Sequence, residues 1–324
     1  MATVVLVGAL AAGCASSGAE GSPGKLRVVT TVAPITSIVA AVAGRRADVA
    51  GIVPEGTNSH TFEPRPSAAE ALSRADVVFV NGLGLDGPTE RLARANLKKG
   101  ARLVELGDRS IAKGDELYDF SFPRKDGRPN PHLWTDPEYA LAYGRVAEDA
   151  LAAADPAGAA EYAANGRAFA AAAGALDAAM RQSLGTVAPA RRKLLTYHDA
   201  YAYFGRDYGW DIVGAIQVSD FEDPTPKEVA ALIDQVRATG VPAIFGSEVF
   251  PSPVLAQIGR ETGARYVDVL RDDDLPGRPG QPEHSWLALL RFDYRTITAA
   301  LGGDPAALDG LALPALPDQA RYPQ

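Results

Sequence analysis

Short apolar runs alternate with helix-forming segments twice along the chain, and this repetition restricts the folds that the sequence can adopt. The runs are rich in Val, Ile and Leu without strict alternation of polar residues, which is typical of strands buried on both faces of a parallel sheet. They are LRVVTTVAP (26–34), ADVAGIVP (47–54), ADVVFVNG (75–82), ARLVEL (101–106), RKLLTYH (192–198), WDIVGAIQ (210–217), PAIFGSE (242–248) and ARYVDVL (264–270). This pattern predicts an α/β protein with two lobes, each a mainly parallel four-stranded sheet flanked by helices.

An alanine-rich segment, residues 136–185, separates the two sets of strands. It contains almost no β-branched residues and should be strongly helical. Asp155-Pro156 interrupts it and starts a second helix that runs to about Leu184. Apolar residues recur along this second helix at Tyr162, Phe169, Leu176 and Met180. We therefore expect one long, rigid helix to join the lobes.

The chain divides into four expected parts. They are a signal or lipoprotein segment with a flexible spacer (1–25), an N-terminal α/β lobe (26–137), a helical connection (138–187) and a C-terminal α/β lobe (188–324). Two segments in the lobes, FEPRPSAAEAL and FEDPTPKEVAAL, are alike. Each predicts a helix that begins with a capping box, formed by Ser67 with Glu70 and by Thr225 with Glu228.

The N-terminal sequence TVVLVGALAAGC ends at Cys14, the one cysteine of the chain. Its apolar run is shorter than the about 20 residues of a membrane-spanning helix, and it is typical of a secretory signal peptide. The small residues before Cys14 resemble a bacterial lipoprotein processing site, at which this cysteine would carry the lipid. No Lys or Arg precedes the run, and Leu10 lies one position further from the cysteine than is usual. The alternative is a buried N-terminal strand with a free thiol.

The net charge of −8 argues against nucleic acid as a partner, because a phosphate-binding surface needs a basic excess. The length of 324 residues suits two domains, and a hydrophobic content of 47% is that of an ordinary soluble protein. We expect a monomer without internal disulfides, stabilised by packing.

Three of the four histidines follow predicted strands. His60 lies in the turn-rich stretch GTNSHTFEPRPS, His132 in RPNPHLWTDP, and His198 at the end of the fifth strand. Asp268 lies at the tail of the last strand. Ligands of open α/β sheets bind beyond the carboxyl ends of the strands, so two residues from each lobe could converge on a cleft between the lobes. We interpret His284 as a residue that merely precedes a helix.

Three imidazoles and one carboxylate are a suitable ligand set for a divalent transition metal. Imidazole nitrogens bind zinc at about 2.0–2.1 Å, and a carboxylate offsets part of the charge. A single histidine is more often a surface or capping residue, so only the matching positions of the three favour a shared site. Glu63 and Asp199 are either partners that orient the imidazoles or solvated surface acids.

At these residues the chain resembles the zinc and manganese solute-binding proteins of bacterial ABC importers, the cluster A-I metal-binding lipoproteins. The resemblance rests on NSHTFEPRPSAAEALSRADVVFVNGLGLD, NPHLWTDPEYA, YHDAYAYFGRDYG and YVDVL, and it extends from about Leu26 to the C-terminus. It implies a metal site in the cleft between the lobes. It also implies that the four metal ligands are His60, His132, His198 and Asp268. The family usually has Asp-Pro before its first ligand, where this chain has Asn58-Ser59.

The resemblance further implies a receptor and not an enzyme. The protein would be periplasmic, or anchored to the outside of the cell membrane by a lipid on Cys14, and would deliver its metal to an ABC permease. Family members with glutamate at the third ligand position resemble manganese binders. His198 therefore favours zinc, with manganese as the alternative, since imidazole in place of a hard oxygen favours zinc.

Two other functions remain open at this point. A zinc hydrolase keeps three protein ligands and a water on the metal, so it would gain support if Asp268 did not reach the site. A receptor for a metal chelate, or an adhesin, is the second. A chelate receptor would line its cleft with arginine and aromatic residues and would not need three histidines.

Overall fold

A computed structural model describes residues 24–216, 224–247 and 253–323 of the chain. Cys14 and the expected signal segment lie outside these residues, so the interpretation of the N-terminus stays a prediction. Within the described ranges, no helix combines the length and the apolar character that a bilayer span requires.

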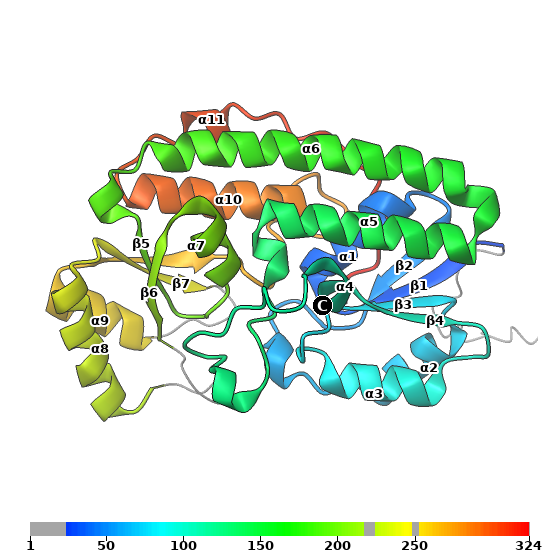
Figure 1. The fold of residues 1–324 in the computed structure, drawn as a ribbon, viewed down its shortest axis with the longest axis horizontal. Coiled ribbons are helices and arrows are strands. Elements are labelled where there is room, and N and C mark those ends of the chain that lie inside the picture. The colour runs from blue at the N-terminus through cyan, green and yellow to red at the C-terminus, as the bar shows by residue number, and fades with distance from the viewer. Residues whose placement is uncertain (1–23, 217–223, 248–252, 324) are drawn as a thin grey trace, which may run out of the picture.

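Two four-stranded parallel sheets form the two lobes (Figure 1). The N-terminal sheet has the order β2-β1-β3-β4 and consists of β1 (Leu26–Thr30), β2 (Ala47–Gly51), β3 (Val77–Val80) and β4 (Arg102–Glu105). The C-terminal sheet has the order β6-β5-β7-β8 and consists of β5 (Lys193–Thr196), β6 (Asp211–Ala215), β7 (Ala243–Ser247) and β8 (Arg265–Leu270). Every predicted run contains one of these strands, and the expected two-lobe α/β fold is confirmed. The strand order is the same in both lobes.

Short helices flank each sheet. In the N-terminal lobe they are α1 (Ala33–Ala43), α2 (Pro66–Arg74), α3 (Gly87–Asn96) and α4 (Leu106–Ser110). In the C-terminal lobe they are α7 (Ala202–Tyr208), α8 (Pro226–Thr239) and α9 (Pro253–Thr262). The predicted capping box of α8 is present, with Thr225 and Glu228 as reciprocal partners. The capping box predicted at Ser67 is wrong, because α2 begins at Pro66 and its Glu70 pairs with Arg74 at 2.7 Å.

A helical layer spans both lobes. Helix α5 (Pro137–Ala154) turns back through Asp155-Pro156 into α6 (Ala159–Gly185), which runs along one side of the whole molecule (Figure 1). The predicted apolar stripe of α6 is buried, and its Phe169 ring lies 5.5 Å from the ring of Trp286 in α10 (Trp286–Ala300). A Cβ on Gly144 of α5 would come within 2.9 Å of the Phe169 ring, so glycine at this position allows α5 and α6 to pack closely. The hydrophobic core is continuous from the N-terminal sheet through α6 to the C-terminal sheet, which makes the connection stiff.

The C-terminal tail leaves the second lobe after α11 (Ala306–Asp309) and returns to the first. Arg321 forms a parallel bridge with Ala50 of β2, and its backbone exchanges hydrogen bonds of 3.0 Å with Val49 and Gly51. The expected boundary, which assigned 188–324 to the C-terminal lobe, therefore does not describe the tail. No sequence pattern announced this crossing, since the tail has neither helical nor strand periodicity.

Candidate metal centre

Three histidines from separate parts of the chain meet in the cleft between the lobes. The Nε2 atom of His60 lies 3.1 Å from Nε2 of His132 and 2.9 Å from Nε2 of His198. Among the described residues these three form the group whose ligand atoms all lie within 4.8 Å of one another. The predicted convergence of the histidines is therefore present in the fold. Nitrogen ligands on a tetrahedral zinc at the usual bond length are separated by about 3.3 Å, close to the observed spacings.

His60 is held by a single turn of 3₁₀-helix, η1 (Ser59–Thr61), beyond the end of β2. The side chain of Asn58 caps this turn by accepting a hydrogen bond from the His60 backbone N–H at 3.0 Å. The hydroxyl of Ser59 donates to Asp273 of the other lobe at 2.6 Å. Asn58 and Ser59, the two residues before His60, thus fix the turn and connect it to the other lobe.

His132 is fully buried and is oriented by Asn130. The Asn130 Oδ1 atom accepts hydrogen bonds from the His132 backbone N–H at 3.0 Å and from Nδ1 at 2.7 Å. The Asn130 amide group donates to Asp119 and to the backbone carbonyl of Asp199, which fixes the orientation of the amide. The His132 Nδ1 atom must therefore carry the ring proton, and its Nε2 presents a lone pair to the other histidines.

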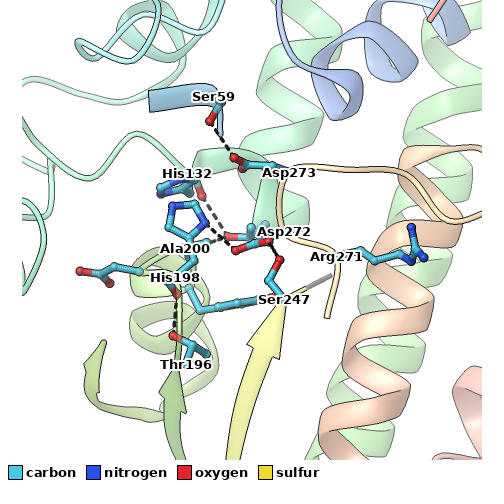
Figure 2. A network of polar contacts seen from close by, with 12 residues as sticks. Ser59, His132, Thr196, His198, Ala200, Ser247, Arg271, Asp272 and Asp273 are labelled. Atoms are coloured by element: carbon cyan, nitrogen blue, oxygen red, sulfur yellow. Dashed lines mark hydrogen bonds and ion pairs between the residues drawn. The ribbon is translucent and has the colours of Figure 1, made fainter. Parts of the chain in front are cut away.

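His198 is oriented by a carboxylate (Figure 2). Its Nδ1 atom lies 2.5 Å from Oδ2 of Asp272, and the other carboxylate oxygen accepts a hydrogen bond from Ser247 at 2.8 Å. Burial alone would lower the pKa of His198, but the Asp272 carboxylate reverses this and raises that pKa to about 9. At neutral pH and without metal, His198 is therefore an imidazolium paired with Asp272.

The other two rings are neutral. Burial lowers the pKa of His60 well below its usual range, and the positive charges of His198 and Arg128 lower it further. Burial and the neighbouring rings have the same effect on the pKa of His132. In the metal-free protein the proton on Nε2 of His198 can form a hydrogen bond with Nε2 of His60. Nε2 of His132 carries no proton, so this arrangement places no proton in the contact between His60 and His132. A metal cation that displaces the proton of His198 would accept a lone pair from the Nε2 atom of each of the three rings.

Asp268 does not join this group. It lies in β8, the edge strand of the C-terminal sheet, and its side chain is exposed. Its predicted place as the fourth residue of the site is corrected, because the strand continues to Leu270 and the chain reaches the cleft only beyond it.

Asp272 and Asp273 occupy the place that was expected for Asp268. In Figure 2 both side chains point toward the histidine side of the loop, whereas Arg271 points away. The Oδ2 atom of Asp273 accepts the Ser59 hydrogen bond, and its Oδ1 atom is buried without a hydrogen-bond partner among the described residues. Burial raises the pKa of Asp273 to about 6. The sequence signal for these residues is the run of three consecutive acids in RDDDLPG, which begins two residues after the last strand. None of the three was predicted as a site residue.

The structure distinguishes the two interpretations given for Glu63 and Asp199 and corrects the one given for His284. Glu63 is exposed. Asp199 is buried beside His198 and accepts a hydrogen bond from the Ser121 backbone N–H at 2.9 Å, so it supports the loop that covers the site. His284 is also buried, with its ring against Tyr322 and its Nε2 atom 3.6 Å from Glu55. It links the tail to the loop of His60 and does more than precede a helix.

Comparison with known proteins agrees with this geometry. The model of the family described as zinc-uptake complex component A, periplasmic, matches residues 28–300. The chain belongs to this family. The family resemblance drawn from the sequence is confirmed.

Relatives in this zinc-uptake component family are named for different metals. The manganese-binding lipoprotein MntA of Halalkalibacterium halodurans is 27% identical over 92% of this chain and 96% of its own length. The iron-binding protein YfeA of Yersinia pestis is 30% identical over 86% of this chain and 87% of its own. These proteins are named for binding a metal and not for catalysis, in agreement with the expectation of a receptor.

Solved structures of similar proteins have the same fold. A manganese-bound periplasmic metal-binding protein from Candidatus Liberibacter asiaticus is 26% identical, with a TM-score of 0.73 over 86% of this chain and all of the other. The periplasmic zinc-binding protein TroA from Treponema pallidum has a TM-score of 0.77 over 86% of this chain and 99% of its own, at 23% identity. The family membership fixes the class of protein, whereas the metal differs among its members.

Proposed function

We propose that the chain is an extracytoplasmic receptor that captures one divalent transition-metal ion and delivers it to an ABC permease. The observation that carries the proposal is the convergence of three imidazole Nε2 atoms, with the tautomer of His132 fixed by Asn130 and His198 held by Asp272. Lipid attachment at Cys14 would hold the receptor at the membrane, as the lipoprotein names of relatives suggest.

Asp273 is the proposed fourth ligand. Its buried Oδ1 atom has no hydrogen-bond partner in the described part of the chain, and burial of an unpaired carboxylate oxygen is costly. Binding to the cation would remove that cost. Ser59 holds the other oxygen, so the carboxylate keeps its orientation in the cleft.

Zinc is the proposed cargo, with manganese as the alternative. Three imidazoles and one carboxylate suit zinc, whereas manganese prefers a larger share of oxygen ligands. A hydrolytic zinc would need an open position on the metal, and on the proposed ligand set Asp273 would occupy that position. We therefore do not expect the metal to keep the open, water-bearing position that a zinc hydrolase requires.

Zinc affinity of the purified protein and its variants tests this proposal. Competition with a coloured zinc chelator should show one site, which is lost in His132→Ala and weakened at least tenfold in Asp273→Asn. Asp268→Asn is the matched control, because it removes an exposed carboxylate of the preceding strand β8, outside the cluster. Equal losses in the Asp268 and Asp273 variants, or none in either, would contradict the proposed ligand set.

A further inference from the structure

A cavity of about 340 Å³ opens beside the histidine cluster. His60 forms part of its wall, together with Leu83, Phe120, Phe122, Lys125 and Arg128. Phe122 also lines the cavity, and its ring lies 5.5 Å from the ring of His60 and 5.7 Å from that of His132, so the cavity borders the cluster. The volume of the cavity lies in the range of small-molecule sites and is much larger than a single metal ion needs.

The charge of the cavity is opposite to what a bare cation would favour. Lys125 and Arg128 line it with one acid, Asp126, in a chain whose net charge is −8. Arg128 lies close enough to His60 to act on that ring electrostatically. Within the described part of the chain the Lys125 ammonium forms neither a hydrogen bond nor an ion pair, and it remains available to a ligand. Fixed cations near a site for a divalent metal weaken the binding of the bare ion.

The position of Arg128 is set by packing. Its side chain lies along the backbone of Gly84, where a Cβ would come within 3.0 Å of the arginine Cδ atom. Gly84 has a φ of +84°, a conformation that favours glycine. The guanidinium is thus supported at the wall of the cavity. Arginine in such a place presents several donors in a plane, which matches a carboxylate.

We propose that this cavity binds a small polycarboxylate, such as citrate, that contacts the metal next to His60. The inference rests on the proposed function and adds a second ligand to it. Arg128 and Lys125 would neutralise the carboxylates that face away from the metal, and Phe120 and Phe122 would cover the carbon skeleton. An ion that prefers six ligands, such as manganese, would gain more from the extra oxygens than zinc, which four protein ligands already satisfy.

Titration of the cobalt-loaded protein with citrate tests the inference. Cobalt(II) reports its own coordination through its visible absorption, and desalting followed by elemental analysis shows whether it stays bound. The spectrum should change to saturation while one cobalt per protein is retained. In the Lys125→Gln/Arg128→Gln variant, the citrate affinity should fall about tenfold or more, as expected when charge-assisted hydrogen bonds are lost. The affinity for cobalt alone should be unchanged or higher in that variant.

Arg124→Gln provides the matched control. Arg124 belongs to the same loop, but its guanidinium lies over the ring of Tyr118 at 4.2 Å and does not line the cavity. This variant should bind citrate like the wild type. Removal of the cobalt by citrate without a new spectrum, or equal citrate affinity in all variants, would overturn the inference while leaving the metal receptor intact. A protein that binds no cobalt under either condition would overturn the proposed function as well.

Discussion

Replacement of Asp272 by asparagine should change how metal affinity depends on pH. The Asp272 carboxylate pairs with Nδ1 of His198 and raises the pKa of that ring to about 9. Metal can bind only the neutral imidazole, so below this pKa it must displace a proton. Asparagine keeps the size of the side chain and removes the charge. Burial then dominates and should bring the pKa of His198 below its usual range, as it does for His60 and His132.

The magnitude follows from the shift. Between pH 9 and pH 7 the affinity of the wild type should fall about 50-fold, or about 2.3 kcal/mol, because half of the His198 rings are still neutral at pH 9 and about one in a hundred is neutral at pH 7. At pH 9 the asparagine variant should bind about 10- to 100-fold more weakly than the wild type, since it lacks the orienting carboxylate. At pH 7 the two affinities should lie within about fivefold of each other, and the variant can then be the tighter binder. The pKa values of His60 and His132 lie too low to contribute in this range.

Chelator competition between pH 6.5 and pH 9 measures both affinities. Calorimetry in buffers of different ionisation enthalpy should also show about one proton released per metal at pH 7 by the wild type and nearly none by the variant. Asp268→Asn is the control, because that exposed carboxylate does not face the cluster, and its pH profile should match the wild type. Parallel pH profiles for the wild type and Asp272→Asn would refute this role of the ion pair.

Three further predictions concern the supports of the site. Asn130→Ala should weaken zinc binding about 10- to 100-fold, because His132 loses the acceptor that fixes its tautomer. Chelator competition measures the loss. Glu63→Gln, at an exposed position, is the control and should leave zinc binding unchanged. Phe169→Ala should lower the free energy of unfolding by about 3–5 kcal/mol, since this ring packs against both Gly144 and Trp286, and denaturant unfolding of the metal-free protein would contradict this with a change below about 1 kcal/mol. Zinc at 100 times its dissociation constant should stabilise the folded protein by about 2.7 kcal/mol, and a melting temperature that does not respond to zinc would show that the ion does not bind the folded state.

Much of the fold could be predicted from the sequence because its signals are local. Strands buried on both faces are continuously apolar, and a helix such as α6 repeats its apolar residues at a fixed interval, so both patterns are visible in the chain. The capping box of Thr225 and Glu228 was found in the same way. Ser67 and Glu70 have the same spacing, but the helix already begins at Pro66, so Ser67 lies inside its first turn and cannot cap it.

The sequence predicted the three histidines of the site, because they follow predicted strands along the chain. His60 and His198 lie shortly beyond the strands β2 and β5, whereas His132 lies further along the chain, after α4 and directly before η3. Asp268 was chosen by its place in the motif YVDVL, yet it lies inside the edge strand. The roles of Asn130, Asp272 and Asp273 depend on contacts between segments far apart in the chain, which no local pattern encodes. The return of the tail to β2, and with it the burial of His284, has the same cause.

Elemental analysis of the purified protein tests the central claim most directly. The protein would be stripped with chelator, offered equal concentrations of zinc and manganese, and separated from free ions before measurement. We predict one equivalent of zinc per chain, reduced to none in His198→Ala. One equivalent of manganese would keep the receptor and reverse the choice of metal. An absence of bound metal in the wild type, or full binding in His198→Ala, would contradict the assignment of the three histidines as the metal centre.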